Sequence, residues 1–261
     1  MSLFQEPVRA YMSRSIETVS PTTDLHHVLA KLQERRLSAL PVVNPANVPL
    51  GIVSRTDLIH LGIANIALRG NTPSLPLPMR TAGDVMTPSP VIVSPQLSLR
   101  DAAHEMIHRS IHRVLVVEDQ RLVGVLSTLD LATAVYDARI DSPLSAWMTS
   151  PVVTVQANQP IAAADDLLDR LHVTALVVTE DGWPIGVFGQ VEALAARDLP
   201  RDTPIGIVLD AAMICLPDTC RAYRAAAHAS QLEVRRVIAT RGAEIVGIVG
   251  GLDFARIVAT A

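Results

Sequence analysis

The feature that most constrains the fold of this chain is an internal repeat, because copies of one segment tend to fold into copies of one structure. Four stretches read MSRSIETV, MTPSPVIV, MTSPVVTV and LDAAMICL, and they begin at Met12, Met86, Met148 and Leu209. Four others read GIVSRTDL, GVLSTLDL, GVFGQVEA and GIVGGLDF, and they begin at Gly51, Gly124, Gly186 and Gly247. The two sets advance together along the chain, which indicates four copies of one unit.

Each copy has the pattern of a strand, a helix, two strands and a second helix, which predicts a mixed α/β fold of four β-α-β-β-α repeats. Pro21 and Pro95 end the first strand in repeats one and two. The first helix has apolar residues at helical spacing, namely Leu25, Val28, Leu29 and Leu32 in repeat one and Leu99, Ala102, Ala103 and Met106 in repeat two. Residues 40–43 and 114–117 follow as short strands, and the second helix is expected to begin at the Ser/Thr/Asp cluster after Gly51 or Gly124.

A single repeat of this size buries little surface, so we expect the repeats to pair. In chain order the first pair is residues 1–137, with repeats at about 8–61 and 82–135. The second pair is residues 138–261, with repeats at about 144–194 and 205–259. A chain of 261 residues is long enough for two such domains.

Composition narrows the possible functions. The net charge of −4 and the lack of a basic run disfavour broad electrostatic binding to nucleic acid. No apolar run is long enough to cross a membrane, and the first residues lack the apolar core of a signal peptide, so the sequence predicts a cytoplasmic protein without a membrane partner. The two cysteines, Cys215 and Cys220, are too few for a disulfide framework or a zinc clip, and we expect no metal site and no resident cofactor.

The repeated landmarks resemble the CBS domain, a unit that occurs in tandem pairs called Bateman modules. The resemblance covers nearly the whole chain, is strongest in RLSALPVV at residues 36–43 and GIVSRTDL at residues 51–58, and is weaker in repeats three and four. Such modules typically bind adenosine-containing ligands (AMP, ADP, ATP or S-adenosylmethionine) in clefts between paired repeats. The resemblance therefore implies four CBS repeats paired into two Bateman modules, as a monomeric disc or a homodimer.

The motif G-h-h-[ST]-x-x-D, in which h is hydrophobic, places Ser54, Thr56 and Asp57 at the start of a helix. A carboxylate accepts hydrogen bonds from both vicinal hydroxyls of a ribose, and the N–H groups of a helix N-terminus suit an anion. The resemblance places His112 and Arg113 of repeat two against the phosphates of the same ligand, where a guanidinium offers a planar set of donors. The alternative interpretation is that Ser, Thr and Asp only cap the helix.

A second cleft is expected on the opposite side of the first pair. Its residues are Ser127, Asp130, Ser15, Leu37 and Ser38. Asp130 repeats the role of Asp57, and the small or apolar side chains flank a flat base. The positions that match the His-Arg pair hold Ser38 and an alanine, so phosphate charge has to be met elsewhere in this cleft.

The second half of the chain departs from this pattern. Its acids are Glu192, where the motif has lost its hydroxyl, and Asp253, which follows two glycines. Arg235 is interpreted as the counterpart of Arg113, which makes Arg235 and Asp253 weaker candidates for ligand binding. We expect the second half to be structural or to bind a different ligand.

Residues 104–108 read HEMIH, the HExxH pattern of zinc proteases. The matching helices of the other repeats lack these residues and no third ligand follows, so a zinc metallohydrolase is a remote alternative. The chain has no nucleophile elbow, P-loop or dinucleotide-binding fingerprint. We therefore predict a non-enzymatic sensor that binds an adenine nucleotide or a related metabolite and transmits its occupancy to a regulated protein. The main alternative is a ligand-free scaffold for assembly.

Overall fold

The packing divides the protein into two compact units. The computed structural model describes residues 4–67, 77–196, 199–209 and 213–261, and the side chains of residues 62–67 are not described. Unit 1 is formed by Met1–Ile16, Val91–Val152 and Ala212–Ala261, and unit 2 by Glu17–Pro90 and Val153–Ala211. Each unit has its own hydrophobic core.

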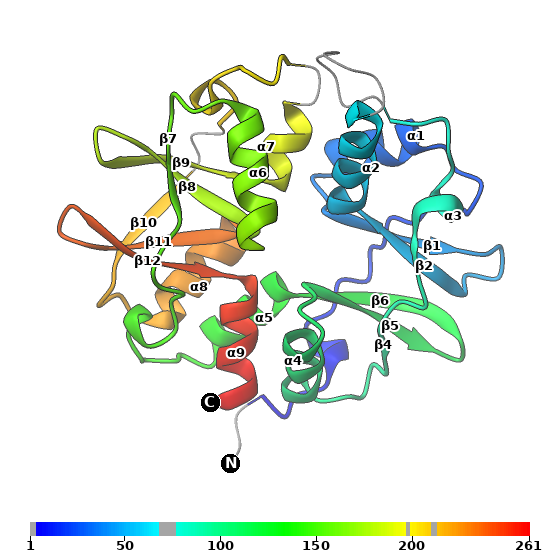
Figure 1. The fold of residues 1–261 in the computed structure, drawn as a ribbon. Helices are drawn as coiled ribbons and strands as arrows, with labels where there is room; N and C mark the ends of the chain where they lie inside the picture. Colours follow the sequence, from blue (N-terminus) through cyan, green and yellow to red (C-terminus); the bar gives the residue numbers. More distant parts are fainter. Residues whose placement is uncertain (1–3, 68–76, 197–198, 210–212) are drawn as a thin grey trace. The chain divides into compact units, whose positions relative to one another are not determined.

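Unit 1 contains repeats two and four together with the segments that lead into repeats one and three. Its two sheets have the strand orders β4-β5-β6 and β10-β11-β12. Its elements in chain order are η1 (Val8–Ala10), β4 (Ile92–Val93), α4 (Leu99–His108), β5 (Arg113–Glu118), β6 (Arg121–Ser127), α5 (Thr128–Asp137), η2 (Leu144–Ala146), β10 (Ile214–Pro217), α8 (Ala222–Gln231), β11 (Arg236–Arg241), β12 (Glu244–Gly250) and α9 (Gly251–Thr260) (Figure 1).

Unit 2 contains repeats one and three together with the segments that lead into repeats two and four. Its two sheets have the orders β1-β2-β3 and β7-β8-β9. Its elements are α1 (Leu25–Glu34), β1 (Ala39–Val43), β2 (Pro49–Ser54), α2 (Arg55–Ala67), α3 (Ala82–Val85), β3 (Thr87–Pro88), β7 (Thr154–Gln156), α6 (Ile161–Leu171), β8 (Ala175–Glu180), β9 (Trp183–Gly189), α7 (Gln190–Ala195) and η3 (Ile205–Ile207).

The four repeats share one sheet pattern. Strands β4, β7 and β10 run parallel to the strand that follows the helix, and that strand pairs antiparallel with the next one. All four hairpins shift register at the same place, directly after Val42, Val116, Val178 and Ala239. The fourth segment, whose sequence is among the most divergent, thus has the same structure as the others, although residues 210–212 of its first landmark lie outside the described residues.

The predicted helices and hairpin strands are confirmed, and the mixed α/β class with them. The residues predicted to face the core are buried in both helices, at no more than 3% exposure in α1 and 0% in α4. Each helix begins at a capping residue, since Asp24 accepts a hydrogen bond from His27 N and Ser98 from Asp101 N. The first strand of repeat one is the exception, because it is reduced to one parallel bridge between Val19 and Val42.

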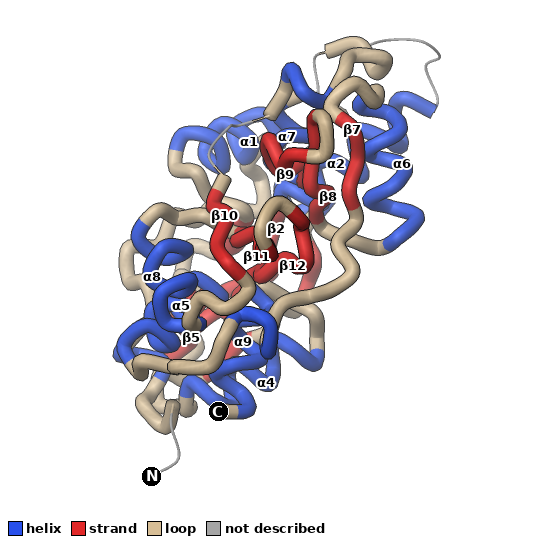
Figure 2. The backbone as a smooth tube through the Cα atoms, turned by 90° about the vertical axis from the view of Figure 1, so that its left-hand side faces the viewer, coloured by secondary structure: helices blue, strands red, loops and turns tan. Residues whose placement is uncertain are grey.

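The compact units do not coincide with the halves 1–137 and 138–261. Helix packing explains the difference in unit 1, where α5 of repeat two packs against α8 and α9 of repeat four (Figures 1 and 2). The buried face of α8 is a stripe of small side chains that allows close approach, namely Ala222, Ala225, Ala226 and Ala229. The pairing of repeats in chain order stays a prediction.

The two sets of sequence landmarks meet in space. A side chain at the start of each repeat lies on the glycine of another repeat: Met12 on Gly124, Met86 on Gly51, Met148 on Gly247 and Leu209 on Gly186. A Cβ would overlap the facing methionine at Gly51, Gly124 and Gly247 and would crowd Leu209 at Gly186, which explains why both landmarks recur together. The exchange is reciprocal between repeats one and two and between repeats three and four.

No helix within the described ranges combines the length and the apolar character that crossing a membrane requires.

Candidate functional site

The acids of the repeated motif lie at the N-terminus of the last helix of each repeat, where they accept a backbone hydrogen bond. The distances from the backbone N–H nitrogen to the carboxylate are 2.7 Å for Ser54 to Asp57, 2.7 Å for Ser127 to Asp130, 2.9 Å for Gly189 to Glu192 and 2.7 Å for Gly250 to Asp253. All four acids therefore cap their helices, whether or not they also contact a ligand. Repeats three and four retain this bond without a hydroxyl.

Capping uses only one oxygen of Asp57 and of Asp130. In both, Oδ2 accepts the backbone bond and a second bond from the serine Oγ at 2.7 Å, whereas Oδ1 has no hydrogen-bond partner among the described residues. That oxygen remains available for a ribose hydroxyl. Asp253 differs, because its Oδ1 accepts bonds from Arg256 Nη2 at 2.7 Å and Thr149 Oγ1 at 3.3 Å.

Replacing Ser127 with alanine is expected to lower the free energy of unfolding by about 1 kcal/mol, because the Oγ also accepts a bond from Asp130 N at 3.4 Å. Ser127→Gly should cost only a few tenths of a kcal/mol, as the glycine caps of repeats three and four indicate. Urea denaturation measures both, with the exposed Ser145→Ala as the control. Equal losses for the alanine and glycine variants would contradict this account.

The basic residues of repeats two and four lie at the start of the strand that follows the helix. His112 precedes β5, and its carbonyl accepts a bond from Thr128 N at 3.0 Å. Arg113 opens β5 opposite Ser127, and Arg236 opens β11 opposite Gly250. The interpretation of Arg235 as the counterpart of Arg113 is therefore wrong, because strand register makes Arg236 that counterpart and Arg235 the counterpart of His112.

Register also identifies the matching pairs in the other two repeats. Ala39 lies opposite Ser54, and Ala175 lies opposite Gly189, so the pairs there are Ser38-Ala39 and Thr174-Ala175. Both basic pairs thus belong to unit 1, and both small, neutral pairs belong to unit 2. Arg236 is the functional candidate that the sequence missed, and strand register is the signal that identifies it.

The basic pairs of unit 1 form one electrostatic group. Burial among protein atoms and then the charges of Arg236, Arg113 and Arg235 lower the pKa of His112 to about 4, although part of the residue is exposed. The N-termini of α5 and α9 also meet here, because a Cβ on Gly251 would overlap Thr128 Oγ1 and lie 3.3 Å from His112 Nδ1. Guanidinium groups beside two helix N-termini suit an anion.

Burial raises the pKa of Asp130, and the nearby Arg113 opposes that rise. Burial likewise raises the pKa of Asp253, with the bond from Gly250 N opposing it. The acids and the basic pairs of repeats two and four are therefore parts of one neighbourhood in unit 1.

The remaining candidates are divided between the units. Ser54 ends β2, Thr56 and Asp57 lie in the first turn of α2, and Leu37 and Ser38 precede β1, all in unit 2. The carbonyl of Ser38 accepts a bond from Arg55 N at 3.0 Å, which matches the bond from Thr128 N to His112. Ser15 is exposed in unit 1. Both predicted clefts combine residues of the two units, and they stay predictions.

The HExxH residues lie on α4. Glu105 is bound by Arg109, with 2.9 Å between Oε2 and Nε, and His104 and His108 are exposed. The described ranges contain no group of three His, Cys, Asp or Glu side chains placed to hold a metal ion. Cys215 and Cys220 are free thiols.

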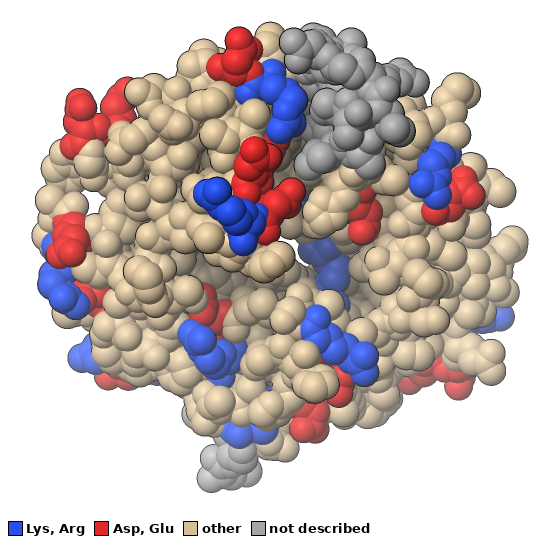
Figure 3. Space-filling view, in the orientation of Figure 1, with Lys and Arg blue, Asp and Glu red and all other residues tan. Residues whose placement is uncertain are grey.

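Acidic and basic side chains are interspersed over the face drawn in Figure 3. Opposite charges at short spacing weaken the electrostatic field over a surface. The group of His112, Arg113, Arg235 and Arg236 differs, because its basic side chains lie close to one another.

The chain is an α/β repeat protein. Each of its four repeats has a small sheet followed by a helix whose N-terminus is capped by an acid. Residues 8–63, 82–137 and 144–197 match the family model of the CBS domain. These ranges cover more than half of the chain, which therefore belongs to the CBS domain family.

The chain is similar over most of its length to other proteins. It is 29% identical over 203 residues to "Uncharacterized 33.4 kDa protein in ribosomal RNA operon" of Thermofilum pendens, with 73% of this chain and 63% of that protein covered. It is 24% identical to MJ1404 of Methanocaldococcus jannaschii, with 98% of this chain and 63% of that protein covered. The chain thus spans somewhat less than two thirds of these two relatives.

The crystal structure of MJ1225 from Methanocaldococcus jannaschii has the same fold, with a TM-score of 0.83 at 16% identity. The likeness covers 96% of this chain and 99% of that one, so it extends over the fourth segment as well as the three that match the family model.

Proposed function

We propose that the protein is a cytoplasmic regulatory protein with four CBS repeats that binds an adenosine-containing ligand of the AMP, ADP, ATP or S-adenosylmethionine class. It transmits occupancy to a partner protein and catalyses no reaction itself. The observation that carries the proposal is the electrostatic group of His112, Arg113, Arg235 and Arg236 in unit 1, which suits the phosphates of a nucleotide.

The ribose is assigned to the acids with an available oxygen. Asp57 and Asp130 each use Oδ2 for the cap, so Oδ1 can accept from a ribose hydroxyl without uncapping the helix. In the family arrangement the acid of one repeat and the basic pair of its partner hold one ligand, which assigns Asp57 together with Arg113. Such a ligand favours one arrangement of two repeats over others, which is how its occupancy can be transmitted.

Isothermal titration calorimetry with AMP, ADP, ATP and S-adenosylmethionine tests the proposal. At least one ligand should bind, and Arg113→Ala and Asp57→Ala should each weaken it roughly tenfold, because each removes a charged hydrogen-bonding group from the ligand. Arg121→Ala, at an exposed arginine that opens β6, is the matched control and should change nothing.

Two results would contradict the proposal. The first is no binding of any of the four ligands by a folded chain, which favours the ligand-free scaffold. The second is binding that Arg113→Ala and Asp57→Ala leave unchanged, which places the ligand elsewhere. Arg236→Ala tests separately whether the newly identified counterpart of Arg113 takes part.

A further inference from the structure

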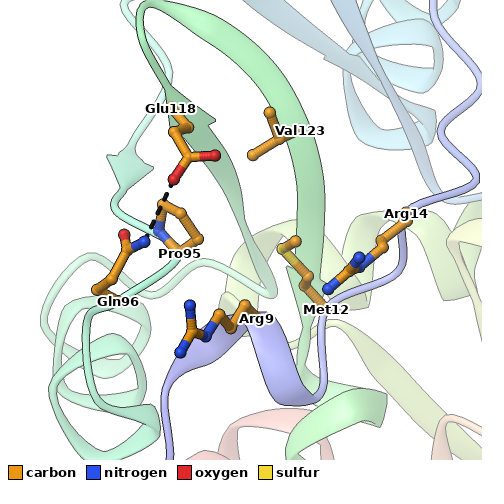
Figure 4. A pocket seen from close by; sticks show the side chains of 7 residues that line it. All are labelled: Arg9, Met12, Arg14, Pro95, Gln96, Glu118 and Val123. Atoms are coloured by element: carbon orange, nitrogen blue, oxygen red, sulfur yellow. Dashed lines mark hydrogen bonds between the residues drawn. The ribbon is translucent and has the colours of Figure 1, made fainter.

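A hollow of about 260 Å³ opens on unit 1 (Figure 4). It lies at the end of β5 that carries Glu118, whereas Arg113 begins the strand at its other end. It is lined by η1 and the segment after it, by the turn after β4, and by the β5–β6 hairpin. The lining residues are Arg9, Met12, Arg14, Pro95, Gln96, Glu118 and Val123. None of them belongs to the nucleotide site proposed above.

The charges of the hollow are unbalanced. Arg9 and Arg14 are exposed, and their side chains form no hydrogen bond or ion pair with any described residue. Glu118 is turned towards Gln96, whose Nε2 donates to Oε1 at 3.2 Å (Figure 4). Two guanidinium groups are therefore available beside one carboxylate that already has a partner.

The positions that correspond to Arg9 in the other repeats do not hold an arginine. The position of Arg9 is identified by its backbone N–H, which donates to the carbonyl of Pro95 at 3.0 Å. The same bond joins Gly83 to Pro21, Ser145 to Asp218 and Gly206 to Ala157. Arg9 thus stands where the other repeats have glycine or serine.

In repeat four the corresponding place holds an ion pair within the chain. There Arg241, at the end of β11, binds Asp218 with Nη2 to Oδ2 at 2.6 Å and Nε to Oδ2 at 3.0 Å. Glu118 is the counterpart of Arg241, because both end the middle strand of their sheets. The ion pair of repeat four is absent from repeat two, and the charge of Arg9 and Arg14 is left for an external group.

The middle of the hollow is apolar. Met12, Pro95 and Val123 lie between the charged groups (Figure 4). A methionine adapts its shape to different apolar groups. The volume is below the roughly 300–1,000 Å³ of pockets that enclose whole small molecules, so the hollow fits side chains of an extended segment better than a nucleotide.

We propose that this hollow docks an acidic peptide segment of a protein partner, with its carboxylates at Arg9 and Arg14 and a neighbouring apolar side chain on Met12, Pro95 and Val123. The two guanidinium groups complement the carboxylates of such a segment and orient it at this site. Arg14 lies two residues before Ile16, where the chain leaves unit 1.

Fluorescence anisotropy with an end-blocked, fluorescein-labelled peptide of sequence Leu-Glu-Leu-Glu-Leu-Glu tests the proposal on the full chain. The peptide should bind saturably, and Arg9→Gln and Arg14→Gln should each weaken it roughly fivefold, with a larger loss in the double variant. The peptide Leu-Gln-Leu-Gln-Leu-Gln should not bind. Arg170→Gln is the matched control, because this arginine is exposed on α6 of unit 2 and does not line the hollow, and it should leave the affinity unchanged.

The proposal is overturned by the lack of saturable binding to the folded chain, by equal binding of the two peptides, or by an equal loss in Arg170→Gln. Full displacement of the peptide by inorganic phosphate or citrate at matched ionic strength would also overturn it in favour of a small anion. The assay contains no nucleotide, and Arg113→Ala should not affect it, so its outcome is independent of the proposed nucleotide binding.

Discussion

Replacing Gly124 with alanine should lower the free energy of unfolding by about 1 kcal/mol, the low end of the cost of overpacking, because the atoms in the way belong to one flexible side chain. A Cβ at this position overlaps Met12 Sδ and lies 3.0 Å from Met12 Cγ and 3.3 Å from Met12 Cε. Gly124 is paired in the sheet with Val116, so the strand cannot retreat without breaking its ladder. The methionine has to move instead, and its packing on unit 1 is lost.

A double-mutant cycle separates this overlap from other effects of the substitution. The three atoms that crowd a Cβ at Gly124 all belong to the end of one side chain, and Met12→Ala removes all of them. In that background Gly124→Ala should cost nothing or stabilise slightly, because alanine restricts the unfolded chain more than glycine does. Chemical denaturation of the four proteins gives the coupling energy.

The predicted loss of stability differs between the landmark glycines, because the atoms that a Cβ would meet differ. At Gly247 a Cβ lies 2.9 Å from Met148 Cβ, an atom that cannot move away from its backbone, so Gly247→Ala should cost at least as much. At Gly186 the nearest atoms, all of Leu209, lie 3.0 to 3.4 Å away, so Gly186→Ala should cost least. A full loss at Gly124 that persists in Met12→Ala would show that the methionine is not the cause.

The repeat pattern predicted the secondary structure because the same order of strands and helices recurs in each repeat. Helix periodicity identified the buried stripes of α1 and α4, and the two landmark sets marked the lead-in segments and the glycines that they cover. The reason for their joint recurrence was not predictable, because the contact joins residues far apart in the chain. Met12 and Gly124 are an example.

Two parts of the prediction depended on information that a linear sequence does not hold. The segment VRRV offers two alignments with IHRV, and only the pairing of Arg236 with Gly250 decides between them. The apolar faces of α5, α8 and α9 predicted that these helices are buried, but not against which partner. The alanine stripe of α8 decides that choice through its fit to α5.

A carboxylate in the core of unit 2 should make the free energy of unfolding depend strongly on pH. Asp165 lies on α6 at 6% exposure, where the matching positions of the other first helices are Leu29, Ala103 and Ala226. Its Oδ2 lies 3.3 Å from Arg201 Nη1. Burial raises its pKa to about 6, with Asp169 and Asp166 adding to the rise and Arg201 opposing it.

The sign of the pH dependence follows from that direction. The folded state holds its proton more tightly than the unfolded state, whose Asp has its ordinary pKa of about 3.9. The stability that this proton contributes is complete below about pH 4 and is lost as the pH rises through about 6. A rise of about two units corresponds to about 3 kcal/mol lost at pH 8.

Asp165→Asn should therefore be more stable than the natural chain at pH 8, by up to about 3 kcal/mol, and equally stable near pH 4. The amide oxygen can still accept a bond from Arg201, whose side chain is 30% exposed and keeps access to water. Urea denaturation at several pH values measures the difference, and subtracting the natural chain removes the titration of every other group. Glu34→Gln, at an exposed carboxylate in the last turn of α1 in the same unit that takes no part in the pKa shift of Asp165, is the control and should leave the pH dependence unchanged. A loss of stability in Asp165→Asn at pH 8 would show that attraction to Arg201 outweighs the cost of burying the charge.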